Sequence, residues 1–367
     1  MTEIDLFISG CNRPTGYFAT SNSPGIRLVR LDTDTGQHRV LANFGGIENP
    51  TFAIASPDLT HIYATTEMPR WPEGAVTAFA IAPDRGAITP LSSQSSAGSI
   101  TAHLSLDRSG RFLLVANHAN DEDFGGREEA VAVLALKPDG DIGDIVATAA
   151  QSGSGPQLPR QQRSHPHAVL ATADNRHLIV TDLGADALFV YPFNADTGAL
   201  GPARTVALTP GTGPRHMAFS HGGTLLHVCG EIDSSVTTLR VGPGAEPEIV
   251  GRCGTLPPGA SGTNHPSEIA LAPTGEHLYV ANRGHDSIAR IAIGKDGVPR
   301  LEECTPCGGT TPRHFACDST GRYLAIANQD SDEVVVLAIG EDAALGGTVA
   351  TIGIGTPTCV GFLQQGS

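Results

Sequence analysis

Side chains that can move protons or hold anions recur in this chain at places that the sequence repeats. His167, Arg215, Glu231 and Arg283 are the most informative of them. A histidine or glutamate can exchange protons with water or a hydroxyl near neutral pH when burial and charged neighbours adjust its pKa. An arginine can bind a carboxylate or phosphate, and it can stabilise the oxyanion that forms when an ester carbonyl is attacked. Opening a cyclic ester would need these functions in one place.

The elements that would position these residues form an internal repeat. Six segments of 18 residues align without a gap, and each has an apolar run, a turn rich in Gly, Asp or Asn, and a second apolar run. The segments are 50–67, 101–118, 166–183, 214–231, 266–283 and 312–329. Residues 357–362 begin a seventh copy, and residues 5–12 resemble its missing continuation.

This repeat predicts an all-β fold, a seven-bladed β-propeller with four-stranded blades. The copies start 45 to 65 residues apart, and two further strand-like runs, such as 187–193 and 287–293, follow them. A period of about 45–50 residues with four strands per unit is typical of propeller blades. The carboxyl-terminal strand would pair with amino-terminal strands, so that no sheet edge stays open. We therefore expect residues 1–367 to form a single propeller domain; two separate β-sandwiches are the alternative that the repeats disfavour.

The repeat also predicts which side chains meet. In a blade the first strand lies beside the central channel and the second runs antiparallel to it, so the start of one and the end of the other share a channel mouth. The residues after the repeat-opening position are Thr51, Ala102, His167, Arg215, Ser267, Arg313 and Thr358. Those at the end of the second strand are Glu67, His118, Leu183, Glu231, Arg283, Gln329 and Cys11. The next residues of the first strand are Phe52, His103, Ala168, His216, Glu268, His314 and Cys359.

The residues at these positions differ from blade to blade in kind and in charge, although repetition alone would make them alike. Such asymmetry is expected of a substrate site built on a symmetric scaffold. Arg215, Arg283 and Arg313 would lie near one mouth of an acidic protein. Three arginines together suggest a site for an anionic group, a carboxylate or a phosphate.

Four stretches of the chain resemble the 6-phosphogluconolactonase-type lactonase family, which includes carboxy-muconate lactonizing enzymes. They are SHPHAVLATADNRHLIVTDLGADALFVYPFNADTGAL, GTGPRHMAFSHGGTLLHVCGEIDSS, ANRGHDSIARIAI and GGTTPRHFACDSTGRYLAIANQDSDEVVVLAI, within residues 164–340. The family is a seven-bladed propeller that acts without a metal. The resemblance implies that His167, Arg215, Glu231 and Arg283 are catalytic, and these are residues that the repeat places at one mouth. Gly230 departs from the Asn that usually precedes the family's Glu.

The resemblance implies a lactonase, a carboxylic ester hydrolase acting on a small sugar-acid or carboxylated lactone, with Glu231 or His167 as the base. The same residues could serve a lactone-forming cyclase or cycloisomerase. A non-catalytic propeller that binds a ligand or a protein is a third hypothesis, although the chain has one Trp and lacks GH…WD signatures. Further substrate-binding residues are expected to be Glu67, His118, His103, His216, Arg313 and Gln329. Substrate choice would reside in the loops 119–129, 151–163 and 254–264.

No cofactor and no metal are expected. Histidines and glutamates gather near the axis, but no HxH or ExxH pair puts ligands on one face, and the arginines would repel a cation. Cys304 and Cys307 form a lone CxxC among seven cysteines. A turn between two strands explains this pair better than a redox or metal role.

Charge excludes several classes of partner. The chain has 38 acidic and 23 basic residues and a formal net charge of -15. Such a surface repels nucleic acids and anionic membranes. The amino terminus has no basic n-region or long h-region, and no run approaches the ~20 apolar residues that span a bilayer. We therefore expect a cytoplasmic protein, a monomer or simple homo-oligomer, whose partner is a small anionic lactone or hydroxy acid.

Overall fold

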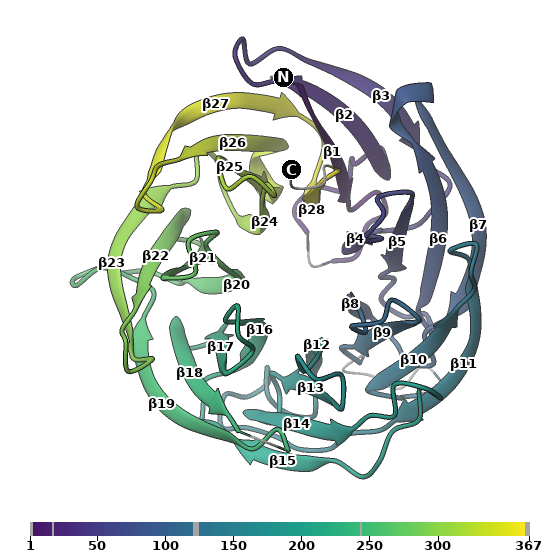
Figure 1. Cartoon of the computed structure of the whole chain (residues 1–367), viewed down its shortest axis with the longest axis vertical. Helices are drawn as coiled ribbons and strands as arrows, with labels where there is room; N and C mark the ends of the chain where they lie inside the picture. The colour runs from purple at the N-terminus through teal and green to yellow at the C-terminus, as the bar shows by residue number, and fades with distance from the viewer. Residues whose placement is uncertain (1–2, 17, 120–124, 243, 364–367) are drawn as a thin grey trace.

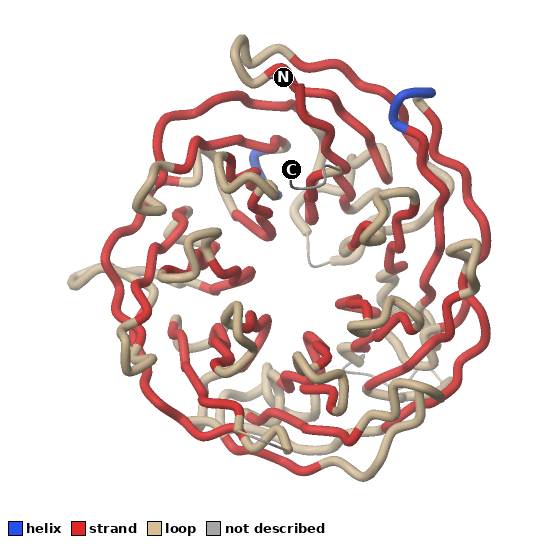
Figure 2. Tube along the Cα trace, in the orientation of Figure 1, coloured by secondary structure: helices blue, strands red, loops and turns tan. Residues whose placement is uncertain are grey.

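The chain folds into seven four-stranded antiparallel sheets arranged in a ring (Figure 1). The computed structural model describes residues 3–16, 18–119, 125–242 and 244–363. Within these ranges the only helical segments are two 3₁₀ turns, η1 (Pro83–Arg85) and η2 (Gln329–Ser331), drawn in blue in Figure 2. The predicted all-β seven-bladed propeller is confirmed. No helix in the described ranges is long and apolar enough to cross a membrane.

Each blade contributes one strand to each of four concentric layers (Figure 1). The innermost strands are β4 (Ala53–Ala55), β8 (Thr101–Leu106), β12 (Pro166–Ala171), β16 (Pro214–Phe219), β20 (His265–Leu271), β24 (Pro312–Cys317) and β28 (Pro357–Phe362). The second strands are β5 (His61–Thr66), β9 (Phe112–Asn117), β13 (His177–Asp182), β17 (Leu225–Gly230), β21 (His277–Arg283), β25 (Tyr323–Asn328) and β1 (Glu3–Gly10). The third strands are β6 (Ala75–Ala82), β10 (Val131–Leu136), β14 (Ala187–Pro192), β18 (Ser235–Val241), β22 (Ser287–Ile293), β26 (Glu333–Ile339) and β2 (Ile26–Asp32). The outermost strands are β7 (Ala87–Ser95), β11 (Ile142–Ala149), β15 (Arg204–Ala207), β19 (Pro247–Gly254), β23 (Pro299–Pro306), β27 (Leu345–Gly353) and β3 (His38–Phe44).

The ring closes within a blade that both ends of the chain build. Strand β28 pairs antiparallel with β1, and the strand order of this sheet is β28-β1-β2-β3. Leu6 lies opposite Phe362 and Ile8 lies opposite Val360 in the register. The prediction that the last strand pairs with amino-terminal strands is therefore correct. Closure removes the free edge that an open sheet would expose.

Aspartates fix the turn between the first two strands of several blades. The Asp107 carboxylate accepts hydrogen bonds from the backbone N–H groups of Ser109 (3.0 Å) and Arg111 (2.8 Å). The Asp318 carboxylate accepts corresponding bonds from Thr320 (3.1 Å) and Arg322 (2.7 Å). An aspartate at the start of a tight turn can satisfy backbone donors that have no strand partner. This explains the Asp in the turns that the repeat shows.

The hydrophobic core lies between neighbouring blades. In one cluster, Ile179 and Leu188 of one blade pack with Met217 and Leu226 of the next. Alternate side chains of a strand point to opposite faces of its sheet, so each blade is buried on both faces. The apolar runs of Ala, Val, Ile and Leu in the repeat meet this requirement. The ring therefore holds the inner strands, and the residues on them, in fixed relative positions.

Candidate active site

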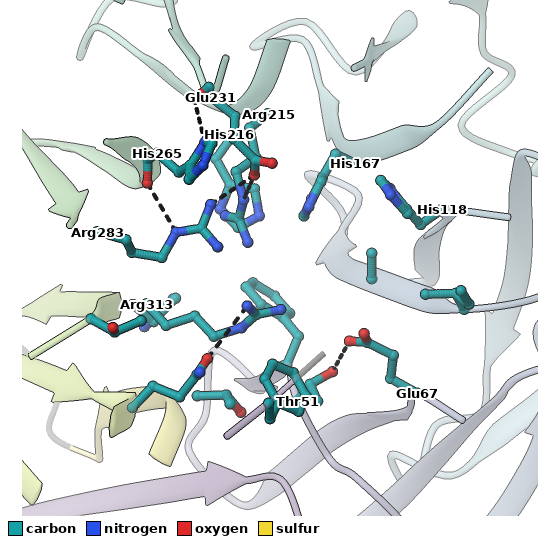
Figure 3. Close-up of a pocket in the computed structure, with 18 of the residues that line it drawn as sticks. Thr51, Glu67, His118, His167, Arg215, His216, Glu231, His265, Arg283 and Arg313 are labelled. Carbon is teal, nitrogen blue, oxygen red and sulfur yellow. Dashed lines mark hydrogen bonds and ion pairs between the residues drawn. The ribbon is translucent and has the colours of Figure 1, made fainter. Parts of the chain in front are cut away.

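A pocket of about 580 Å³ opens at one end of the ring, where the innermost strands begin and the second strands end. This is the channel mouth at which the repeat predicts that the site residues meet. The lining includes these residues from its first two register positions: Thr51, Glu67, Ala102, His118, His167, Arg215, Glu231, Arg283, Arg313, Gln329 and Thr358. From the third position Phe52, His216 and His314 also contact the pocket. Figure 3 labels several of them, including Thr51, His167 and Arg283, around an open space.

A β-bulge at the start of the inner strands turns the site residues toward the pocket. The pairing of β12 with β13 shifts between Pro166 and Ala168, and that of β24 with β25 shifts between Pro312 and His314. His167 and Arg313 are the extra residues at these two shifts. Bulges bend a strand and re-aim a side chain, and they are frequent beside active sites. This geometry also explains why Arg215 and His216, consecutive residues at a wider shift in β16, both line the pocket.

Glu231 lies on one wall with Arg215 and Arg283 beside it (Figure 3), and Arg160 is a third arginine within ion-pair distance. Its carboxylate oxygens lie 2.8 Å from Nη2 of Arg283, 3.0 Å from Nε of Arg215 and 3.1 Å from Nη2 of Arg160. We call Glu231, Arg160, Arg215 and Arg283 the Glu231 wall. One carboxylate against three guanidinium groups leaves this wall with net positive charge.

The electrostatics of this wall keep the carboxylate ionised. Burial would raise the pKa of Glu231, but the charges of Arg283, Arg160 and Arg215 outweigh burial and hold the pKa well below its usual value. Burial, assisted by repulsion from Arg283, lowers the pKa of Arg215 to about 9. Glu231 is therefore a stable anion and a weak proton acceptor.

Backbone contacts fix the members of the Glu231 wall. Nε of Arg283 donates to the carbonyl of His265 at 2.9 Å, and Nδ1 of His265 lies 3.3 Å from the carbonyl of Glu231. Asn282, just before Arg283, is fully buried and donates to the carbonyl of Thr255 at 3.0 Å. Arg283 is thereby anchored at its backbone and at its guanidinium.

Gly230, the residue before Glu231, has little room for a side chain. A Cβ atom at Gly230 would lie 2.5 Å from Oδ1 of Asp233 and 2.8 Å from Oγ of Ser235. Arg252 forms an ion pair with Asp233 and donates to Ser235 at 2.9 Å. These side chains therefore fill the space beside Gly230.

Neutral histidines flank the Glu231 wall. Nη1 of Arg160 lies 3.0 Å from Nε2 of His118, and an arginine can only donate, so this nitrogen accepts and His118 is neutral. Burial, reinforced by Arg215, lowers the pKa of His167 well below 6.5. Nδ1 of His167 is buried and has no hydrogen-bond partner within the described ranges. The ring of His167 extends toward the open space (Figure 3), so at neutral pH an unprotonated imidazole faces a bound substrate and could act as a base during a reaction.

The opposite side of the pocket carries a second arginine environment, which we call the Arg313 wall and which comprises Phe18, Thr51, Glu67, Arg313 and Gln329. The Arg313 guanidinium stacks on the ring of Phe18, 4.8 Å from its centroid. Its Nη1 donates to Oε1 of Gln329 over 3.5 Å. Oγ1 of Thr51 donates to the Glu67 carboxylate at 2.5 Å (Figure 3).

Phe52, His216 and His314 form the pocket floor, and a buried carboxylate, Glu268, contacts the two histidines. Oε2 of Glu268 lies 2.8 Å from Nδ1 of His216 and 3.2 Å from Nε2 of His314. The Phe52 ring packs against both imidazoles, with centroids 5.8 Å and 5.5 Å away. Burial raises the pKa of Glu268 and lowers that of His314 to about 4. Within the described ranges, no group of three or more His, Cys, Asp or Glu side chains could hold a metal ion.

Residues 10–362 match the family described as "Lactonase, 7-bladed beta-propeller". The chain belongs to this lactonase family. The resemblance inferred from the sequence is thus confirmed, and so is the expectation of a lactonase-class enzyme.

Several relatives of this lactonase are named as gluconolactonases or 6-phosphogluconolactonases. A 6-phosphogluconolactonase of Bacillus subtilis is 29% identical over 287 residues, covering 76% of this chain and 77% of that protein. A 6-phosphogluconolactonase of Formosa agariphila is 27% identical, covering 79% and 81%. The solved structure of the Pseudomonas aeruginosa periplasmic gluconolactonase is 26% identical with a TM-score of 0.86, covering 99% of each chain. Because that neighbour is described as periplasmic, a cytoplasmic location of this lactonase stays a prediction.

One predicted substrate-binding residue of the lactonase lies outside the pocket lining. His103 is 7% exposed and packs against Phe52, with ring centroids 4.6 Å apart. Its Nδ1 accepts a hydrogen bond from the backbone N–H of Val169 at 3.4 Å. Phe52, His216 and His314 reach the cavity, whereas His103 packs behind them.

Several pocket residues were not predicted from the sequence. They are Phe18, Ile100, Ala119, Arg160, His165, Thr263, His265, Gly284, Thr311 and Asp330. His165 and His265 each lie two residues before a predicted register position, so the repeat carried a signal for them. Arg160 and Phe18 lie in loops, where no register applies.

The loops expected to determine substrate choice do reach the pocket. Arg160 belongs to the loop 151–163, and Thr263 to the loop 254–264. Residues 120–124 of the loop 119–129 lie outside the described residues. The expectation of a turn at the CxxC is wrong for Cys304, which lies within β23, while Cys307 directly follows that strand. All seven cysteines are free.

Proposed function

We propose that this chain hydrolyses a small lactone bearing an anionic group, in the pocket at the ring mouth and without a metal. The observation that carries the proposal is the neutral His167 beside a carboxylate held by three arginines. A proton acceptor next to fixed cationic donors is what ester hydrolysis requires. The net positive charge of the Glu231 wall would repel a divalent cation, which supports the metal-free reaction.

In the proposed reaction, His167 accepts a proton from water as its oxygen attacks the lactone carbonyl carbon. The negative charge that develops on the carbonyl oxygen is stabilised by guanidinium groups of Arg215 and Arg283. When the tetrahedral intermediate collapses, the ring C–O bond breaks and the protonated His167 returns its proton to the leaving alkoxide. The product is an open-chain hydroxy acid.

Glu231 would act as a positioning residue in this scheme. Its oxygens are already paired with three guanidinium groups, whereas Nδ1 of His167 has no hydrogen-bond partner within the described ranges, and this favours His167 over Glu231 as the base. Its two oxygens hold three guanidinium groups in a fixed arrangement before substrate arrives. Donors that are fixed in advance need little reorganisation as charge develops in the transition state.

The deciding experiment measures acid release from 6-phosphogluconolactone and from a panel of unphosphorylated lactones. The wild type, Glu231→Gln, Arg215→Ala and the double variant are compared, each with correction for spontaneous hydrolysis. We expect the wild type to exceed the double variant by at least about 10²-fold on one lactone. If no lactone is opened faster by the wild type than by the double variant, hydrolysis is the wrong reaction.

A further inference from the structure

Arg313 differs from every other arginine of the pocket in having no carboxylate partner among the described residues. Arg160, Arg215 and Arg283 each lie within ion-pair distance of Glu231. Within the described ranges, the Arg313 guanidinium stacks on the Phe18 ring and forms a 3.5 Å hydrogen bond to Gln329, which is neutral.

The Glu67 carboxylate acts on Arg313 through its charge but does not form an ion pair with it. Burial lowers the pKa of Arg313, and the charge of Glu67 opposes this change. The Glu67 carboxylate, however, is engaged by Thr51 at 2.5 Å and forms no ion pair with Arg313. A partly buried cation without a counter-ion is costly, and binding an anion would relieve that cost.

The geometry around Arg313 suits recognition of an anion from the pocket. Stacking on Phe18 holds the planar guanidinium by its face and leaves its edge available. The edge of a guanidinium offers parallel N–H donors that match the oxygens of a carboxylate or phosphate. Figure 3 shows Arg313 projecting into the same open space as Arg283 and Arg215.

We propose that Arg313 binds the anionic group of the substrate, a phosphate or carboxylate, at a subsite separate from the Glu231 wall. This inference rests on the proposed lactone hydrolysis. The substrate would then span the pocket, with its anion on Arg313 and its ring carbonyl at Arg215 and Arg283. Two attachment points of this kind would orient the ring for attack. A cavity of about 580 Å³ is large enough for such a ligand.

The test measures equilibrium binding, so that it does not depend on turnover. Glucose 6-phosphate, gluconate and glucose share a six-carbon skeleton and carry a phosphate, a carboxylate or no charge. Calorimetric titrations compare the wild type with Arg313→Gln, Arg313→Lys and the control Arg300→Gln. Arg300 is a suitable control because its side chain is 73% exposed and pairs with Glu302 at the surface.

We expect Arg313→Gln to weaken the binding of one of the two anions at least about tenfold more than it weakens the binding of glucose. Arg313→Lys should retain part of the affinity, and Arg300→Gln should match the wild type. The anion for which the variant loses affinity shows whether the subsite binds a phosphate or a carboxylate. Thermal melting of each variant shows whether the fold is intact, and Arg313→Lys provides a second reading if Arg313→Gln is unstable.

The subsite is overturned if both anions bind Arg313→Gln as tightly as wild type, or if the wild type binds neither. Its failure is distinct from failure of the proposed function. Arg313-dependent anion binding without any lactone turnover would leave the subsite standing and remove the hydrolysis. If Arg313→Gln turns over an anionic lactone with an unchanged KM, the hydrolysis stands and the subsite is removed.

Discussion

The two arginine-bearing walls of the pocket differ in where their counter-charge comes from. On the Glu231 wall the protein supplies the anion itself, and three guanidinium groups are fixed around it. On the Arg313 wall the guanidinium has an aromatic ring and an amide for neighbours. A fixed arrangement suits charge that appears only during a reaction. An unpaired cation suits a charge that the ligand brings with it.

The largest expected effect comes from His167, which flanks the Glu231 wall. His167→Gln removes the proposed base while keeping a polar side chain of similar size. We expect kcat to fall by about 10²–10⁴-fold, measured by continuous titration of the acid released. Arg313→Gln should act mainly on KM for an anionic lactone. If His167→Gln keeps kcat within a few fold of wild type, His167 is not the base.

Removing the Glu231 carboxylate should leave the arginines of both walls without a carboxylate partner. Glu231→Gln leaves three guanidinium groups without a charge partner, and we expect a loss of about 3 kcal/mol in unfolding free energy by urea denaturation. The freed arginines should then bind an external anion, so inorganic phosphate should raise the melting temperature of Glu231→Gln more than that of wild type.

The control for this charge change is Glu246→Gln. Glu246 is 69% exposed and pairs with Arg204 at the surface. A surface pair of this kind contributes about 1 kcal/mol or less, so stability and phosphate response should stay near wild type. An equal phosphate response in wild type and Glu231→Gln would show that the carboxylate does not mask the arginines.

The pH dependence of activity should report the titration of His167, beside the Glu231 wall. A lowered His167 pKa means that the imidazole stays neutral as pH falls through 6.5 and becomes protonated only below it. Activity that needs the neutral base should therefore persist at pH 6 and decline only at lower pH. The measurement is kcat/KM between pH 4 and 8. An acid limb centred at or above pH 6.5, or one that persists in the residual activity of His167→Gln, would contradict this assignment.

The smallest effect is expected from the loop contribution to the Glu231 wall. Arg160 is 41% exposed, so its pair with Glu231 is screened by solvent. Arg160→Ala should cost about 1 kcal/mol or less in stability and lower kcat/KM about tenfold, because one charged hydrogen bond is lost. Arg204→Ala is the matched surface control for both measurements. A loss as large as that of His167→Gln would place Arg160 among the reacting groups.

The fold could be predicted from the sequence because the gapless repeat transfers one blade's geometry to all others. The same register was enough to locate Arg215, Glu231 and Arg283 at one mouth. Register could not locate Arg160, since a loop has no period. It also treated His103 as equivalent to His216, whereas His216 lines the pocket and His103 does not. Equivalent backbone positions become different sites once their neighbours differ in size.

The β-bulges at the start of the inner strands have a consequence for how this scaffold can change. The bulged residue is left out of the backbone ladder, so its side chain can be exchanged with little disturbance of strand pairing. His167 and Arg313 occupy two such places, and Ala102 occupies another, at the shift between Thr101 and His103. Ala102 lines the pocket without a functional group. It is a natural position at which evolution or an engineer could add a new contact while the ring stays intact.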